Sequence, residues 1–126
     1  MRLAEFGFPG DLRDRLVAAI LSGEKTSTSS LYAEYEEEGE PLPEAGERQL
    51  VVDSKGRGVA VIELTCVEIK RMDDIDLPFA IDEGEGFESV DEWREAHERF
   101  WRSYRDDDLG DETLVVAERF RVVERL

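Results

Sequence analysis

Residues 48–70 read RQLVVDSKGRGVAVIELTCVEIK. Two runs that are rich in apolar and β-branched residues, 48–53 and 59–70, flank a short segment that contains Gly56 and Gly58. Such runs on either side of a glycine-containing turn are typical of two antiparallel strands joined as a β-hairpin. This hairpin is the stretch of sequence that decides what kind of sheet the chain can build.

Before the hairpin, the sequence predicts a helix, an extended segment and a second helix. From Asp11 apolar residues recur at helical spacing, and Gly23 stands where a left-handed C-terminal cap is expected. Residues 25–30 are rich in hydroxyl groups and favour an extended conformation. Residues 31–38 then suit a short helix, and the glycines and prolines between 39 and 46 indicate a loop.

After the hairpin, two further helices are expected. Pro78 can begin a short helical turn, and Ser89 with Glu92 matches a capping box in front of a longer helix. This longer helix is expected to end near residues 106–108. Its apolar face is predicted to carry Val90, Trp93, Ala96, Phe100 and Tyr104.

The last expected element is a strand over residues 113–123. Its apolar residues occupy largely every second position, and Glu118 interrupts this alternation with a charged side chain. Mostly antiparallel strands with inserted helices favour an α+β domain or a small β-barrel over a doubly wound sheet. A length of 126 residues suits one domain spanning residues 1–126. Its core is expected to include Leu16, Ile20, Val61, Trp93, Phe100 and Phe120.

The charge balance limits the partners that the chain can bind. Thirty-two acidic side chains against 16 basic ones give a net charge of −16, which repels phosphate backbones and anionic membranes. RNA is thereby disfavoured, although folding could still gather a basic patch from Lys25, Arg48, Arg57 and Arg119. The absence of a long apolar run, of a secretion-signal pattern and of a second cysteine leads us to expect a soluble, cytoplasmic protein.

The usual catalytic motifs are absent, and so are paired cysteine and histidine ligands. We therefore expect no metal and no cofactor. The acidic run at 106–108 lacks the alternation of a calcium loop and is interpreted as a solvated helix end. The lone His97 is interpreted as a packing or hydrogen-bonding residue outside the site. Cys66, within an apolar strand, is expected to be buried and unreactive.

The segment 25–28 offers one candidate for chemistry. Lys25 follows the helix cap directly, and Thr28 lies three residues further on. A partly desolvated amine can act as a base for a hydroxyl nucleophile. Lys25 can equally be a surface cation near the helix C-terminus. In a regular strand, positions three apart face opposite sides, so the two side chains meet only if a turn or bulge intervenes.

Together, several segments resemble the ASCH domain family. They are residues 23–28 (GEKTST) after a helix, 43–47 (PEAGE) before a strand, 62–65 (IELT) within the next strand, 79–86 (FAIDEGEG), 93–97 (WREAH) and 118–120 (ERF). The resemblance extends over nearly the whole chain. It implies a PUA-like β-barrel with inserted helices, which agrees with the α+β prediction.

The resemblance also implies a function. Some ASCH proteins hydrolyse N4-acetylcytidine to cytidine and acetate with a lysine, a threonine and a glutamate, which correspond here to Lys25, Thr28 and Glu83. In that reaction the hydroxyl of the threonine attacks the amide, and the lysine handles the proton of this hydroxyl. The glutamate orients the reacting groups or shuttles the proton. Glu85 is the alternative to Glu83 for this last role. Residues expected to bind a nucleoside-like substrate are Thr26, Ser29, Tyr32, Glu63 and Glu85.

Two other functions remain open at this stage. ASCH proteins are also associated with RNA, so the chain can be an RNA-binding or RNA-cleaving module, or a ligand-binding regulator without catalysis. The segment between Thr28 and Gly46 is longer than in compact amidohydrolase members, which leaves the substrate open. Candidates to stack on a base are Tyr32, Tyr35, Phe79 and Trp101.

Overall fold

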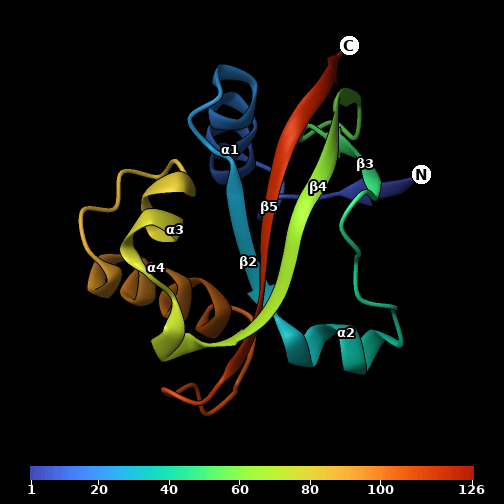
Figure 1. The fold of residues 1–126 in the computed structure, drawn as a ribbon. Coiled ribbons are helices and arrows are strands. Elements are labelled where there is room, and N and C mark those ends of the chain that lie inside the picture. Colours follow the sequence, from blue (N-terminus) through green and yellow to red (C-terminus); the bar gives the residue numbers. More distant parts are fainter.

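A computed structural model describes residues 1–126. Its centre is a five-stranded sheet in the order β1-β3-β4-β5-β2, in which β1 runs parallel to β3 and all other pairs are antiparallel. The strands are β1 (Arg2–Ala4), β2 (Ser27–Leu31), β3 (Arg48–Val52), β4 (Gly58–Arg71) and β5 (Leu114–Arg125). The sheet curls into a half-barrel with β1 and β2 at its two edges (Figure 1). The predicted α+β class is confirmed.

The predicted hairpin is formed by β3 and β4. At its turn, Asp53 Oδ1 accepts hydrogen bonds from the backbone N–H groups of Lys55 and Arg57, both at 2.9 Å. Gly56 adopts a positive φ of 77°, which glycine tolerates without steric cost. The hairpin also provides the edge to which β1 adds. Strand β1 was not predicted from the sequence, because three residues are too few to show a periodicity.

The curl of the sheet arises in β4 and β5, which pair from Ala60 and Arg125 to Arg71 and Leu114. Their register shifts between Val61 and Ile62, and again between Leu64 and Cys66. Such bulges bend a strand and increase its twist. The long ladder therefore wraps around the interior instead of remaining flat.

Four helices surround the half-barrel: α1 (Asp11–Ser22), α2 (Tyr32–Glu38), α3 (Leu77–Asp82) and α4 (Val90–Arg102). A single 3-10 turn, η1 (Met72–Asp74), leads from β4 toward α3. In Figure 1, α1 lies beside one half of the sheet, while α3 and α4 lie together beside the other half. None of these helices has the length and apolar character that crossing a bilayer requires.

The helix ends follow their capping residues. Gly23 caps α1 with φ +87°, and Ser89 accepts a hydrogen bond from Glu92 N at the start of α4, both as predicted. However, α4 ends at Arg102 and not near residues 106–108. The Ser103 N–H donates to the carbonyls of Arg99 and Phe100, which tightens the last turn and closes the helix early.

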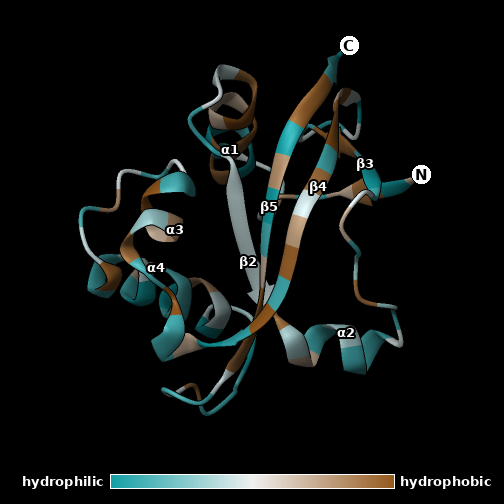
Figure 2. Ribbon diagram, in the orientation of Figure 1, coloured by the Kyte–Doolittle hydropathy of each residue, from teal (hydrophilic) through white to brown (hydrophobic).

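Two apolar clusters stabilise the fold. The first packs α1 against β3, β4 and Phe120, and the second packs α3 and α4 against β5. Strand β5 serves both, since Val115 and Ala117 belong to the second cluster while Phe120 belongs to the first. Figure 2 shows these apolar stretches along β4 and β5 in the middle of the molecule, with the largely hydrophilic α2 away from them.

The predicted core is right at all positions but one. Leu16, Ile20, Val61, Trp93 and Phe120 are buried. Phe100 is only partly buried, and its ring packs against Phe8 and Tyr104 with centroid distances of 5.4 and 5.5 Å. The inward stripe of α4 is Trp93, His97 and Trp101, spaced four residues apart, rather than the predicted stripe through Phe100.

This difference between Trp93 and Phe100 is measurable. Trp93→Ala removes a fully buried ring and is expected to lower the free energy of unfolding by about 3–5 kcal/mol. Phe100→Ala is expected to cost less than half as much, because its ring is already partly solvated. Urea unfolding of both variants measures the two values. Equal costs would show that the inward face of α4 is assigned wrongly.

Candidate functional site

The site begins with a close backbone contact between two segments that are far apart in the sequence. Thr26 N donates to Asp82 O at 2.7 Å, which fixes the start of β2 against the end of α3. Gly84 has φ +72°, and a Cβ added there would lie 2.8 Å from the backbone of Glu24 and Lys25. Only glycine allows this approach, which brings Lys25 next to Glu83.

Lys25 is 2% exposed, and its amine is surrounded by oxygen atoms. Its Nζ donates to Ser27 O at 2.9 Å and to Glu83 O at 3.2 Å, and it lies 3.5 Å from Glu83 Oε1. The amine also lies 5.8 Å from the centre of the Phe6 ring. These three oxygens match the three N–H groups of an ammonium ion, so Lys25 is a buried cation and not a surface one.

Glu83, which caps the C-terminal end of α3, accepts hydrogen bonds with both carboxylate oxygens. Oε2 accepts from Trp93 Nε1 at 2.5 Å and from Ser29 Oγ at 2.8 Å, while Oε1 faces His97 Nε2 at 3.2 Å. Burial alone would raise the pKa of Glu83. The positive charges of His97 and Lys25, with the hydrogen bonds from His97 and Trp93, lower it to about 2.

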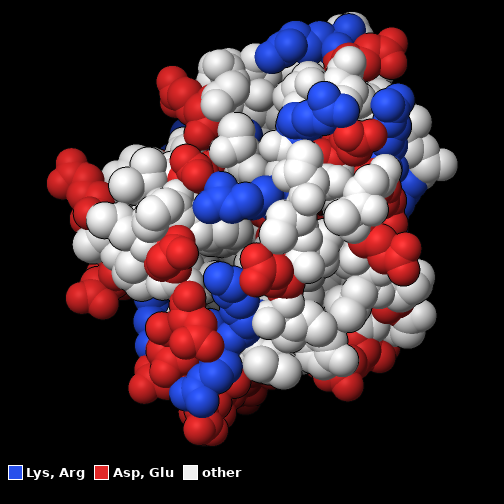
Figure 3. All heavy atoms as spheres, viewed as in Figure 1, with Lys and Arg blue, Asp and Glu red and all other residues white.

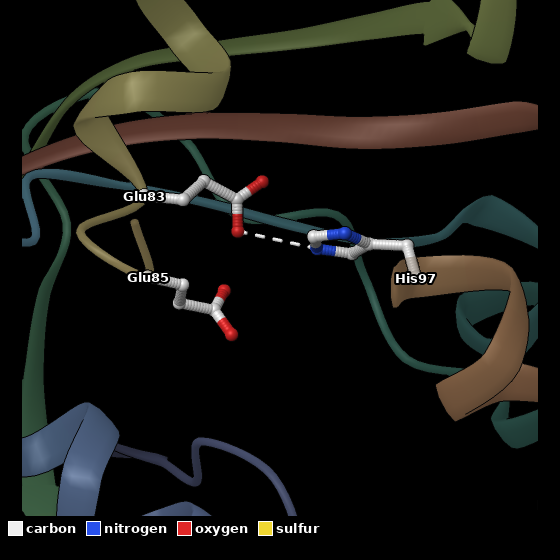
Figure 4. Close-up of side chains that lie close together, drawn as sticks. All are labelled: Glu83, Glu85 and His97. Carbon is white, nitrogen blue, oxygen red and sulfur yellow. Dashed lines mark hydrogen bonds and ion pairs between the residues drawn. The ribbon is translucent and has the colours of Figure 1, made fainter. Parts of the chain in front are cut away.

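His97 projects from α4 toward Glu83, as Figure 4 shows. Its Nδ1 lies 2.8 Å from Trp93 O, and its ring stacks on the Trp93 ring with centroids 4.5 Å apart. Both ring nitrogens therefore face groups that can only accept, which requires a proton on each. Burial opposes this charged form, but the Glu83 carboxylate outweighs it and raises the pKa of His97.

His97 corrects one interpretation of the sequence. It was expected to pack or to form hydrogen bonds outside the site; it does pack against Trp93, but its side-chain hydrogen-bonding partner is Glu83, with which it forms an ion pair beside the cleft. The spacing of Trp93, His97 and Trp101 along one helical face was the available signal. A lone histidine carries no indication of its partner, since Glu83 reaches it only through tertiary packing.

An open cleft of about 1370 Å³ lies beside this cluster. Of the eight predicted site residues, five line it: Lys25, Thr28, Ser29, Glu83 and Glu85. The Thr28 hydroxyl makes no hydrogen bond to Lys25, whose amine donates to Ser27 O and Glu83 O. Glu85 is exposed at the cleft; partial desolvation there raises its pKa against the attraction of Lys25.

The other three predicted residues lie elsewhere. Glu63 pairs with Arg48 at 3.3 Å and Arg121 at 2.7 Å, outside the cleft. Tyr32 begins α2 and lines a separate, smaller hollow. Thr26 is also absent from the cleft wall, and its backbone joins β2 to α3 and β5. These three residues therefore lie apart from the cleft that Lys25, Thr28 and Glu83 line.

The cleft contains two polar groups that the sequence analysis did not assign to a site. Glu118 of β5 lines it and is 7% exposed, yet its carboxylate has no hydrogen bond or ion pair with any side chain. Ser30 Oγ is buried without a hydrogen-bond partner. The sequence signals for Glu118 were its interruption of an apolar alternation and its place in the segment 118–120 that resembles the family; neither indicated a role in the site.

The aromatic side chains at the cleft also differ from those expected. Phe79 and Trp101 are buried in the second core cluster, and Tyr32 lies outside the cleft. Of the four stacking candidates, Trp101 and Tyr35 both line the cleft, but only the Tyr35 side chain is partly exposed there. The exposed aromatic surface there comes from Phe8 and Tyr104, whose rings meet edge to face at 5.1 Å.

One group of side chains has the composition of a metal site. Ligand atoms of Glu83, Glu85 and His97 lie within 4.8 Å of one another (Figure 4). A divalent cation there would have to replace the proton that His97 directs to Glu83, and it would meet the Lys25 cation 3.5 Å from the same carboxylate. The geometry suits a network of hydrogen-bonded ion pairs, in which protons bridge the side chains, better than a bound metal ion.

The four cations that could have formed a basic patch are each paired with an acid. Lys25 is buried against Glu83. The partners of the other three, at 2.8–3.3 Å, are Glu63 for Arg48, Asp53 for Arg57 and Asp82 for Arg119. In the view of Figure 3, blue basic side chains mostly lie beside red acidic ones. Each of the four cations that folding could have gathered therefore already has an acidic partner.

Cys66 is not buried, contrary to expectation. The bulge between Leu64 and Cys66 leaves its side chain partly exposed on β4. Its thiol donates a hydrogen bond to Glu68 at 3.3 Å, and this bond raises the pKa of the thiol. A raised pKa keeps the thiol protonated and a weak nucleophile, so the expected lack of reactivity now rests on a different cause.

Comparison with solved structures agrees with this architecture. The crystal structure of a protein from Enterococcus faecalis, assigned to family DUF984, superposes with a TM-score of 0.87 at 32% identity, covering 99% of this chain and 77% of that one. The ASCH domain from Lactobacillus crispatus superposes with a TM-score of 0.79 at 33% identity, covering 89% of this chain and 72% of that one. The half-barrel with inserted helices is a PUA-like α+β fold.

The family model described as ASCH domain matches residues 3–124. The chain belongs to the ASCH domain family, as the sequence motifs predicted. A mutant ASCH protein from Zymomonas mobilis superposes with a TM-score of 0.53 over 87% of this chain and 65% of that one; at 16% identity it shares the fold alone. No curated protein matches the chain.

The ion-pair network makes a testable prediction for His97, the only histidine of the chain. Its pKa should lie above the ordinary value of 6.5, and Glu83→Gln should lower it, because the carboxylate that raises it most is removed while burial still favours the neutral ring. Glu85→Gln is the matched control and should change it less. NMR titration of the imidazole ring measures all three proteins.

The same shift has a consequence for stability with a definite sign. Because the folded protein holds the His97 proton more tightly than the unfolded chain, the stabilisation is complete below pH 6.5 and is lost as pH rises through the raised pKa. A wild-type His97 that titrates below 6.5 would contradict the proposed charge state of the network.

Proposed function

We propose that this ASCH domain is a metal-independent amidohydrolase that removes the acyl group from an N-acylated nucleoside, with N4-acetylcytidine as the candidate substrate. The observation that carries the proposal is the Thr28 hydroxyl in an open cleft beside the buried Lys25, Glu83 and His97 network. A hydroxyl, a fixed cluster of charge and an accessible cleft are what acyl transfer requires.

In the proposed reaction, Thr28 Oγ1 attacks the amide carbonyl carbon. Negative charge then develops on the carbonyl oxygen, and a preorganised cation nearby stabilises it more strongly in a desolvated site than in water. Lys25 supplies that charge, and Glu83 with His97 holds it in place. Lys25 is therefore given an electrostatic role here, because each of its three N–H groups already faces an oxygen.

The walls of the cleft support a nucleoside as the substrate class. Phe8, Tyr35 and Tyr104 offer aromatic surface for one base, and Ser29 and Ser30 add hydroxyl groups to the wall. Aromatic surface together with polar groups that fix the orientation of a ligand is typical of small-molecule sites. A polymer would need several free cations for its phosphates, and the candidate cations are paired with acids.

The proposal predicts turnover that depends on Thr28. Purified protein without added metal should release cytidine from N4-acetylcytidine, and Thr28→Ala should reduce kcat by at least about 100-fold because the attacking hydroxyl is removed. Thr28→Ser keeps a hydroxyl and should retain part of the rate. Thr65→Ala, an exposed threonine on β4, is the matched control and should behave as wild type. Liquid chromatography of the released base measures each rate.

Two results would contradict the proposed function. One is the absence of product from every acylated nucleoside tested with the wild-type protein. The other is a Thr28→Ala variant as fast as wild type. Saturable nucleoside binding without turnover would favour the ligand-binding regulator in its place.

The charge distribution makes a separate prediction about RNA. Single-stranded RNA should bind with a Kd above about 10 μM at physiological salt, because affinity for nucleic acid derives mainly from neutralised phosphates. Fluorescence anisotropy with a labelled oligonucleotide at two salt concentrations provides the measurement. Submicromolar binding that weakens steeply with salt would favour the RNA-binding alternative.

A further inference from the structure

Glu118 lies directly opposite Thr28 across the antiparallel pair of β2 and β5. Side chains at directly paired positions share one face of a sheet, with their Cβ atoms about 4.5–5.5 Å apart. Both residues line the cleft. A threonine hydroxyl and a glutamate carboxyl attached at this separation can reach each other, or hold one small group between them.

The Glu118 carboxyl group differs from every other acid near the cleft. It is 7% exposed and has neither a hydrogen-bond donor nor a cation within ion-pair distance. The ionisable groups around it are Glu47, Arg2, Lys25 and Tyr35. Burial raises the pKa of Glu118 to about 7, and the negative charge of Glu47 is the second cause of this increase. The attraction of Arg2 and Lys25 opposes it more weakly.

We infer that Glu118 is the catalytic acid and base of the cleft, which takes the proton of the Thr28 hydroxyl and delivers it to the leaving amine. This inference rests on the proposed function and adds a residue to it. The family resemblance supplied Lys25, Thr28 and a glutamate after α3, whereas Glu118 comes from the pairing of β2 with β5.

The proton balance of the reaction closes with Glu118 alone. The ionised carboxylate takes the Thr28 proton as the Oγ1–carbon bond forms; the carbon–nitrogen bond then breaks, and the nitrogen leaves with that proton. The Glu118 carboxylate next takes a proton from water, which attacks the acyl-threonine ester. Release of the carboxylic acid returns the proton to Thr28 Oγ1, so one water is consumed and both residues are restored.

The two alternative bases are less suited to this task. The Lys25 amine donates hydrogen bonds to Ser27 O and Glu83 O and pairs with Glu83 Oε1 at 3.5 Å, and it makes no hydrogen bond to Thr28. Glu83 accepts from Ser29, Trp93 and His97 and has a pKa of about 2, which makes it a weak base. An acid–base group works best with a pKa near the operating pH, which Glu118 has.

The experiment compares variants of Glu118 in the hydrolysis of N4-acetylcytidine. Glu118→Gln keeps the size of the side chain but cannot exchange a proton, and it should lower kcat by at least about 100-fold with little change in KM. Glu118→Asp should restore part of the rate. Glu124→Gln, at an exposed position on the same strand, is the matched control. Urea unfolding verifies that each variant is folded.

The pH profile gives a readout that a purely structural residue would not change. The wild-type kcat/KM should fall as pH drops below about 7, because the carboxylate needed as base becomes protonated. Glu47→Gln removes the neighbouring negative charge, which should lower the pKa of Glu118 and move this limb of the profile to lower pH.

Each outcome decides between the two proposals. If Thr28→Ala is inactive while folded Glu118→Gln retains wild-type kcat, or if Glu47→Gln leaves the profile unmoved, Glu118 is not the proton carrier and the amidohydrolase stands without it. If wild-type protein hydrolyses no acylated nucleoside, the proposed function fails and this inference fails with it. Loss of kcat in Glu118→Gln, recovery in Glu118→Asp and a shifted limb in Glu47→Gln together support Glu118.

Discussion

The ion pair between Lys25 and Glu83 is the constraint on which the rest of the site depends, because both side chains are about 1% exposed. Removing one partner of such a pair typically costs about 3–5 kcal/mol, since the other charge stays buried. The surrounding groups supply the hydrogen-bond partners that two buried charges require. Ser29, Trp93 and His97 donate to Glu83, and backbone carbonyls accept from Lys25, so few polar atoms of the pair remain unsatisfied.

This network explains the positions of several elements at once. Trp93 and His97 fix α4 against the end of α3, while Lys25 fixes the start of β2 against the same point. Gly84 allows the two backbones to approach so closely. The hydroxyl-rich strand β2 is thereby held at the edge of the sheet, with Thr28 turned to the cleft.

The cleft combines two carboxyl groups whose surroundings push their pKa values in opposite directions. Glu83 is surrounded by donors and cations and stays ionised, whereas Glu118 is buried, is repelled by the charge of Glu47 and has a pKa of about 7. Such a divergence is a common basis for assigning one acid an electrostatic role and the other a role in proton transfer. The same fold thus separates charge stabilisation from proton exchange.

The local sequence determined the β3–β4 hairpin, the caps at Gly23 and Ser89, the α+β class and the motifs of the family, because each depends on neighbouring residues. Only the tertiary structure decided that His97 lies against Glu83 and that Glu118 is paired with Thr28. It also decided that Glu63 and Tyr32 lie outside the cleft. Thr28 and Glu118 are separated by 90 positions, and which residues pair is set by strand register. A slip of one residue would turn Glu118 to the opposite face, and no local pattern of residues fixes that choice.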